Sequence, residues 1–142
     1  MTGQELDETY KILVAAAEST PFAKTGGLAD VAGSLPKALS AWGNDVRLVI
    51  PCYRGIDDWK VLADFPVWVN GRRETAVLRQ SYVRARVDDV DRLIPVYFID
   101  SYHYFDRDRF YDFPDDAERW AFFSRAILEM IRVIGWKPDI IH

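Results

Sequence analysis

The sequence contains few of the residues on which thiol and metal chemistry depend. Its 142 residues include one cysteine, Cys52, and two histidines. A single cysteine excludes an internal disulfide and fits a reducing compartment, and we expect it to be a small buried hydrophobe. His103 and His142 have no partners in the sequence that would complete a metal site. We therefore predict no bound metal and no cofactor.

The sequence also lacks an excess of positive charge and a long apolar run. The 18 Lys and Arg residues against 22 Asp and Glu residues give a formal net charge of -4, so we expect no broad basic field for nucleic acid or an anionic membrane. No segment reaches transmembrane length. Residues 1–10 are expected to form a flexible polar leader without a targeting signal. These features favour a cytoplasmic protein that binds neither nucleic acid nor membranes.

The sequence does contain a folding pattern that is rich in apolar residues. Hydrophobic residues make up 49% of the chain, which is ample for a core. A buried strand is predicted over 11–17, a helix from Leu28 to Trp42 that Pro36 should kink, and a second strand over 45–51. Strand, glycine turn, helix and strand form a right-handed parallel crossover. The predicted fold class is α/β, a Rossmann-like parallel sheet with helices on both faces.

The second half of the chain adds a hairpin and a long helix. Asn70 and Gly71 lie between two alternating segments, which predicts a tight β-hairpin inserted into the fold. After a buried strand over 93–100, an aromatic surface loop leads to a helix that Asp115 should cap, with Glu118 as its capping-box partner. A final strand begins at 137–142.

The stretch ESTPFAKTGGLADVAG, residues 18–33, joins the first strand to the first helix. Gly26 and Gly27 would let backbone amides approach a ligand, and the helix that follows offers unpaired N–H groups to an anion. Lys24 adds an ammonium group, so a phosphate site is one reading. The other reading is a sharp turn with a solvated lysine. The stretch matches neither the dinucleotide-binding fingerprint nor the P-loop.

The segment KTGGLADVAGSLPKAL resembles the Lys-x-Gly-Gly-Leu signature of bacterial glycogen synthases and plant starch synthases. The resemblance continues in GNDVRLVIPCY, IPVYFID, YFDRDRFY, DDAERWAFFSRAILE and WKPDIIH, so it covers residues 11–142. It implies the N-terminal half of a two-domain, GT-B type glycosyltransferase. It also implies retaining transfer of glucose from ADP-glucose to the non-reducing end of an α-1,4-glucan.

The resemblance assigns roles to individual residues. Lys24 matches the lysine that contacts the donor, Gly26 and Gly27 match the loop over its phosphates, and Asp30 matches an acidic position of the motif. A first-turn carboxylate that is favoured by the helix dipole explains Asp30 equally well. Glu18 is a weaker candidate. Phe105 stands where some relatives have tyrosine, which puts a hydrogen bond to glucan there in doubt.

The chain ends at His142 with the last strand barely formed. We therefore expect residues 11–142 to be a partial N-terminal catalytic domain whose C-terminal domain is absent. The resemblance implies that the groups that neutralise the leaving diphosphate belong to that absent part, so we expect no catalytic residue here and no turnover by this chain alone. The alternative is a non-catalytic module that binds glucan or a sugar phosphate through the aromatic loop at 102–111.

Overall fold

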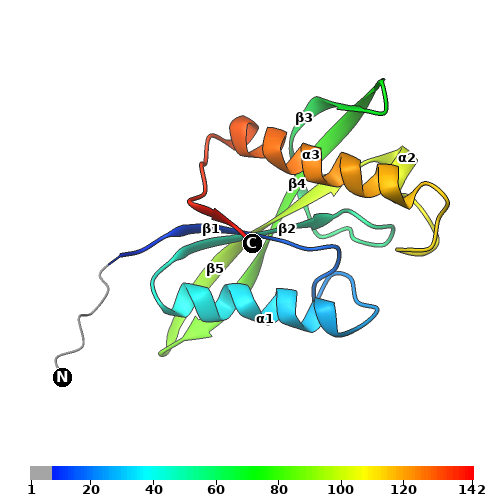
Figure 1. Cartoon of the computed structure of the whole chain (residues 1–142). Helices are drawn as coiled ribbons and strands as arrows, with labels where there is room; N and C mark the ends of the chain where they lie inside the picture. Colours follow the sequence, from blue (N-terminus) through cyan, green and yellow to red (C-terminus); the bar gives the residue numbers. More distant parts are fainter. Residues whose placement is uncertain (1–7) are drawn as a thin grey trace.

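The computed structural model describes residues 8–142, so residues 1–7 of the expected leader lie outside the described part. A six-stranded sheet forms the centre of the fold, with the strand order β3-β4-β5-β2-β1-β6. Helix α1 covers one face and α3 covers the other (Figure 1). The elements are β1 (Lys11–Ala15), α1 (Gly27–Ala41), β2 (Asp45–Pro51), β3 (Lys60–Val69), β4 (Arg72–Val87), β5 (Val90–Asp100), α2 (Tyr102–Phe105), α3 (Asp116–Ile134) and β6 (Ile140–Ile141).

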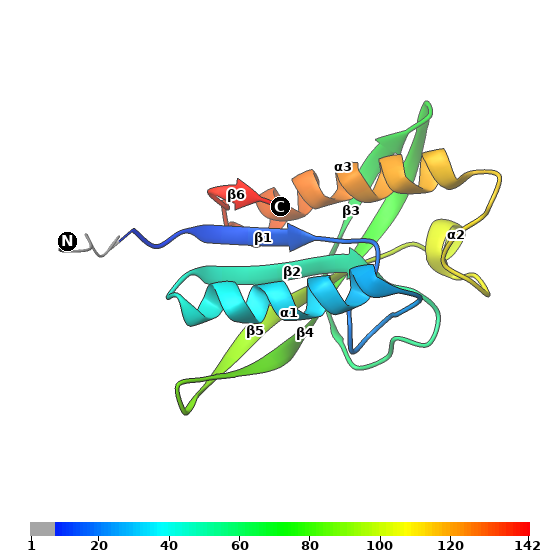
Figure 2. The ribbon, with the colours of Figure 1, turned by 60° about the horizontal axis from the view of Figure 1, so that its bottom comes forward.

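The parallel half of the sheet consists of β5, β2, β1 and β6. Strand β2 has the predicted bounds, whereas β1 ends two residues before its predicted end. Leu13 pairs with Arg47 of β2 on one side and with Ile141 of β6 on the other. Figure 2 shows β6 beside β1 at the edge of the sheet. Because helices cover both faces, the central strands are apolar almost throughout.

Helix α1 packs on the sheet through small residues. Ala29, Ala32, Pro36 and Ser40 are buried, and the helix runs through Pro36 to Ala41. The larger apolar residues Leu28, Val31 and Trp42 are exposed. Small side chains allow the helix to lie close to the sheet, so its larger residues point outward.

The antiparallel half of the sheet contains the predicted hairpin, formed by β3 and β4, and a second antiparallel pairing of β4 with β5. Asn70 and Gly71 have φ of 50° and 71°, the left-handed conformation that a two-residue hairpin turn requires. Strand β4 is 16 residues long and pairs with β3 on one side and β5 on the other. Arg84 and Arg86 are exposed and Ala85 is buried, as the alternating pattern predicts.

Helix α3 packs on the hairpin and forms with it the core on one face of the sheet. Its buried apolar residues pack on the same cluster as Phe65, Val67 and Leu78 of β3 and β4. The helix ends at Gly135, which has φ of 63° and caps it in the left-handed conformation. The core on the other face of the sheet consists of residues from β1, β2 and β5, including Val14, Leu48 and Phe98.

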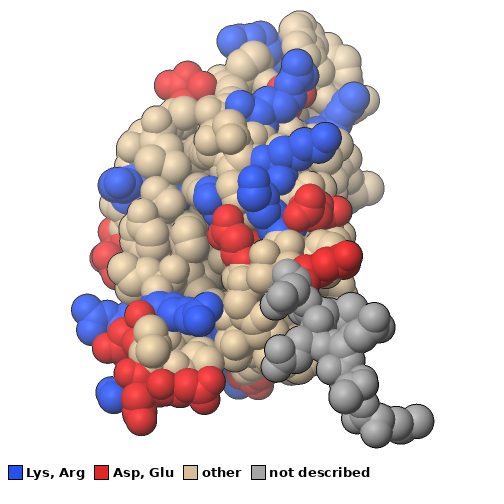
Figure 3. All heavy atoms as spheres, turned by 90° about the vertical axis from the view of Figure 1, so that its left-hand side faces the viewer, with Lys and Arg blue, Asp and Glu red and all other residues tan. Residues whose placement is uncertain are grey.

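Charged side chains of both signs cover the surface. On the face that Figure 3 shows, basic groups gather toward the upper half and acidic groups lie among and below them. This face does not present one continuous basic field of the kind that attracts nucleic acid. No helix within residues 8–142 is long and apolar enough to cross a membrane.

Candidate functional site

The glycine turn, residues 16–27, leaves the carboxyl end of β1 and enters α1. Its middle is held by local contacts, because the amides of Phe22 and Ala23 both donate to the carbonyl of Ser19, at 3.0 and 2.9 Å. Phe22 packs edge-on against Phe98 of β5, with ring centroids 5.0 Å apart. The turn is therefore anchored to the sheet, and residues 24–27 lie beyond the anchor at the edge where ligands of open parallel sheets bind.

A buried carboxylate fixes the end of the glycine turn. Glu18 is 3% exposed, and it accepts hydrogen bonds from both the backbone N–H and the hydroxyl of Thr25. Tyr111, from the segment before α3, has its half-buried ring near Glu18. Burial, together with the negative charge of Glu18, raises the pKa of Tyr111 to about 12. Glu18 therefore holds Thr25, near the end of the turn, by hydrogen bonds from within the fold.

Lys24 and Asp30 form an ion pair across the glycine turn. The ammonium nitrogen of Lys24 lies 2.8 Å from each carboxylate oxygen of Asp30, and both side chains are more than half exposed. An exposed pair of this kind contributes little to stability and can exchange partners. The two candidate residues are thus brought together, with Asp30 supplying the counter-charge to Lys24.

Gly26 and Gly27 form the open amino end of α1. Gly26 is the N-cap residue, and no side chain caps the first N–H groups of the helix. A Cβ added at either glycine would meet nothing within 4 Å, and φ at Gly26 is -162°, an extended conformation that any residue adopts. Neither packing nor the backbone of this chain requires a glycine here. The amides remain accessible from the side on which a side chain would otherwise stand.

Gly33, about two turns further along α1, differs from Gly26 and Gly27. A Cβ at Gly33 would lie 2.1 Å from the hydroxyl oxygen of Thr20 and 3.0 Å from its carbonyl oxygen. The amide of Thr20 donates to the carbonyl of Ala29 at 3.1 Å. This glycine therefore permits close contact between the helix and the turn, which is a structural role.

The predicted capping box at the start of α3 is wrong. Asp115 is the N-cap residue but makes no side-chain cap bond. Its two carboxylate oxygens instead accept from the guanidinium of Arg107 at 2.6 and 2.7 Å. Hydrogen bonding to Arg107 lowers the pKa of Asp115, although burial opposes the shift. Glu118 binds Asn70, Arg72 and Tyr104.

Arg119 lies in the core and binds the backbone of the aromatic segment, residues 102–111. It is fully buried and donates to the carbonyls of Tyr104 and Phe110, each at 2.8 Å, as well as to Asp116. Phe105 is also fully buried, so its ring belongs to the core and does not face a ligand. The aromatic residues at 104 and 105 therefore give no support to a glucan platform, whereas Tyr102 is 85% exposed.

The histidines take part in ordinary contacts. Nδ1 of His103 lies 3.2 Å from a carboxylate oxygen of Glu74, and the backbone of His142 pairs with β1. In the described part of the chain, no group of three or more His, Cys, Asp or Glu side chains could hold a metal ion. Cys52 is buried, and desolvation raises the pKa of its thiol to about 12, which makes the thiol a poor nucleophile.

Sequence reasoning missed Thr25 and Tyr111. Thr25 lies between two candidates and makes its contacts through Glu18. Tyr111 approaches from a distant part of the chain, and local patterns carry no signal for such a contact. The buried state of Glu18 was the missing information, because a buried carboxylate requires hydrogen-bond donors.

Taken together, the sheet order, the helices on both faces and the open glycine turn define an α/β domain with a Rossmann-like sheet and an inserted hairpin. The predicted fold class is thus confirmed. Comparison with known proteins gives the family. Residues 11–142 match the model of the starch synthase catalytic domain, and the chain belongs to this family.

Individual relatives agree with the family match. The chain is 47% identical to glycogen synthase of Desulforudis audaxviator over 142 residues, covering 96% of this chain and 28% of the relative. It is also 47% identical to glycogen synthase of Moorella thermoacetica, covering 96% of this chain and 27% of the relative. The chain thus spans less than a third of the length of these relatives.

A solved structure supports the fold. The catalytic domain of starch synthase IV from Arabidopsis thaliana, bound to ADP and acarbose, matches with a TM-score of 0.79 and 33% identity. The match covers 95% of this chain and 28% of the other. The prediction of a GT-B type glycosyltransferase half agrees with this match.

Proposed function

We propose that this chain forms the side of the active site of a glycogen or starch synthase that binds the diphosphate of the donor. The reaction is transfer of glucose from ADP-glucose to the non-reducing end of an α-1,4-glucan, with retention of configuration. Lys24, the amides of Gly26 and Gly27, and the amino end of α1 hold the diphosphate of the donor. The proposed location is the cytoplasm. We propose that the C-terminal domain of the longer protein forms the other side of the active site.

One observation carries the proposal. The two glycines at the amino end of α1 have open space where side chains would stand, and neither packing nor backbone conformation accounts for them. Backbone amides that are free to approach a ligand, next to a lysine, suit the small and highly charged diphosphate. The ADP in the Arabidopsis structure supports a nucleotide donor.

Asp30 has a defined part in this proposal. In this structure Asp30 neutralises Lys24 at 2.8 Å, and Glu18 adds a second negative charge nearby. The amino end of α1 must therefore provide much of the attraction for the diphosphate, and Lys24 changes partner from Asp30 to a phosphate oxygen. Asp30 then becomes available to accept a hydrogen bond from a sugar hydroxyl.

The test uses the longer protein that contains this chain. The variant Lys24→Ala removes the proposed phosphate contact, and Lys37→Ala, which removes an exposed lysine of α1, is the control. A charge-assisted hydrogen bond is worth about 1.5 to 3 kcal/mol, so we expect kcat/KM for ADP-glucose to fall about 10- to 100-fold in Lys24→Ala alone. Unchanged kinetics in that variant would contradict the role of the lysine.

A second assay addresses the 142-residue chain. Retaining transfer builds charge on both the anomeric carbon and the leaving phosphate, which requires groups on both sides of the bond that breaks. We therefore expect no incorporation of glucose into glycogen by this chain alone. Turnover by the isolated chain would refute the proposal that the second domain is needed.

A further inference from the structure

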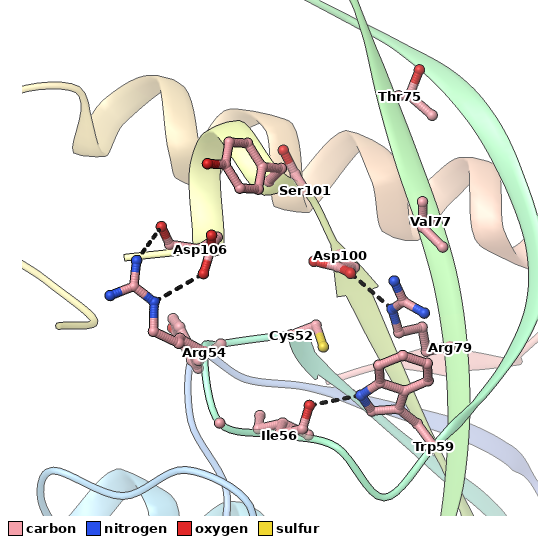
Figure 4. Close-up of a pocket in the computed structure, with 13 residues that line it drawn as sticks. Cys52, Arg54, Ile56, Trp59, Thr75, Val77, Arg79, Asp100, Ser101 and Asp106 are labelled. Atoms are coloured by element: carbon pink, nitrogen blue, oxygen red, sulfur yellow. Dashed lines mark hydrogen bonds and ion pairs between the residues drawn. The ribbon is translucent and has the colours of Figure 1, made fainter. Parts of the chain in front are cut away.

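Glu18 is stabilised differently from other carboxylates at the carboxyl edge of the sheet. Asp100, at the end of β5, lies 2.8 Å from Arg79, and Asp106 lies 2.9 Å from Arg54. Figure 4 shows both ion pairs in the cavity beside the end of β5. Each of these carboxylates therefore has a positive partner that offsets the cost of its partial burial.

Glu18 is more deeply buried, and a residue of its own turn binds it. It is 3% exposed, whereas Lys24, the nearest lysine in the sequence, pairs with Asp30 at 2.8 Å. The carboxylate of Glu18 accepts from the N–H and the hydroxyl of Thr25. A neutral acceptor at this position would avoid the cost of burying a charge. Chains tolerate local costs of this kind at functional sites, so the carboxylate favours a role beyond stability.

The bonds to Thr25 fix the part of the turn from which the proposed donor contacts extend. The N–H of Thr25 and the carbonyl of Lys24 belong to one planar peptide group, so the bond to Glu18 sets the direction of both. The hydroxyl of Thr25 lies 2.9 Å from each carboxylate oxygen and attaches the same residue a second time. Lys24 therefore precedes a fixed peptide group, and Gly26 follows the residue that Glu18 holds.

This attachment matters because the next two residues are glycines. Glycine has more accessible backbone conformations than other residues and loses more entropy when it is ordered. The bonds to the carbonyl of Ser19 end at Ala23, and no side chain caps α1 at Gly26. Glu18 thus anchors the turn between that point and the glycines.

We propose that Glu18 is a positioning residue for the donor, which holds Thr25 so that Lys24 and the glycine amides are already in place for the diphosphate. The inference rests on the proposed function and adds to it a residue that does not touch the donor. A site that is ordered in advance binds more tightly, because less entropy is lost when the ligand arrives.

The charge of Glu18 makes the two possible effects of its removal opposite in sign. A negative charge near a diphosphate repels it, so removal of the charge alone would tighten donor binding. Loss of the bonds to Thr25 would weaken donor binding instead. The sign of the measured change therefore separates positioning from simple repulsion.

Kinetics of the longer protein with ADP-glucose and glycogen test this inference. Glu18→Ala removes both bonds to Thr25, and we expect KM for ADP-glucose to rise at least about fivefold, with kcat and KM for glycogen changed less than about twofold. Glu18→Gln keeps an oxygen for the Thr25 amide and should raise KM less. Glu118→Gln makes the same change at a carboxylate bound to the hairpin and α2, and should leave KM for ADP-glucose unchanged.

Changes at Thr25 keep the test decisive where Glu18→Ala does not fold. Thr25 is exposed, and Thr25→Val removes its hydroxyl while it preserves the shape of the side chain. We expect KM for ADP-glucose to rise at least about twofold in Thr25→Val. Thr25→Ser keeps both donors and should raise KM less.

Two results at Glu18 would overturn the inference. A lower KM for ADP-glucose in Glu18→Ala or Glu18→Gln would mean that the charge only repels the donor. A loss of stability with KM unchanged would mean that the role is purely structural. The double variant of Glu18→Ala with Lys24→Ala should lose less affinity than the product of the two single losses, because both residues act on one set of contacts. Independent losses would also count against the inference.

The same kinetics separate this inference from the proposed function. If Lys24→Ala raises KM for ADP-glucose while the changes at Glu18 and Thr25 do not, the positioning role is refuted and the proposed function stands. Unchanged kinetics in Lys24→Ala would refute the proposed function, and with it the inference that rests on it.

Discussion

Gly27 and Gly33, both in α1, should respond in opposite ways to substitution by alanine. Gly33→Ala places a methyl group 2.1 Å from the Thr20 hydroxyl and 3.0 Å from its carbonyl oxygen. The hydroxyl can rotate away at the loss of its 3.3 Å bond to Ala29, worth about 1 kcal/mol. The carbonyl cannot rotate, so the helix must shift, and overpacking of this kind costs about 1 to 3 kcal/mol.

The helix propensity of alanine offsets part of that loss. Alanine is favoured over glycine in a helix by about 1 kcal/mol, so we expect Gly33→Ala to destabilise the chain by about 1 to 3 kcal/mol. Gly27→Ala meets nothing within 4 Å and should leave stability unchanged or raise it by up to about 1 kcal/mol. Urea denaturation followed by tryptophan fluorescence measures both values.

A double variant and an activity assay refine this test. Thr20→Ala combined with Gly33→Ala removes the closest contact, so the two changes together should cost less than the sum of each alone. In the longer protein, Gly27→Ala should lower kcat/KM for ADP-glucose although the fold is intact. Gly27→Ala that destabilises as much as Gly33→Ala would refute the argument that the glycine turn is open. Full activity in Gly27→Ala would contradict its proposed contact with phosphate.

Three further predictions concern the polar groups that organise the site and the segment before α3. Tyr111→Phe removes a half-buried hydroxyl that interacts with Glu18, and urea denaturation should show a loss of about 1 kcal/mol. Arg119→Met leaves the buried carbonyl of Tyr104 and the part-buried carbonyl of Phe110 without their donor. It should cost about 2 to 4 kcal/mol by the same assay, and a loss below about 0.5 kcal/mol would count against a structural role. Because Arg107 lowers the pKa of Asp115 in the folded state, that contribution is present above about pH 4 and disappears as the pH falls through the folded pKa. The stability difference between Asp115→Asn and the parent should therefore shrink below pH 4 in urea titrations, and a difference independent of pH would contradict the pairing.

The success of sequence reasoning depended on the range of the interactions involved. The bounds of β2 and the turn at Asn70 and Gly71 were predicted correctly. Burial on both faces gives a strand a continuous apolar sequence, and left-handed backbone angles favour Asn and Gly. The capping box failed because Arg107 and residues of the hairpin bind Asp115 and Glu118. These partners are close only in the folded chain.

In the candidate site, too, contacts between residues that are distant in the sequence could not be predicted. Lys24, Gly26, Gly27 and Asp30 were located from one short motif, and the structure brings them together at the amino end of α1. Their proposed contacts with the donor stay a prediction. The support of the turn by Glu18 and Tyr111 depends on burial and on the position of a distant segment, and the sequence alone does not reveal either.

The ion pair between Lys24 and Asp30 has a consequence for selectivity. An anion that approaches the turn finds the ammonium group already occupied, so simple attraction to a lone positive charge gives it no advantage. Under the proposed function, a ligand must replace Asp30 at Lys24 and also engage the helix amides. Recognition at several points would then favour the diphosphate of the donor over free phosphate.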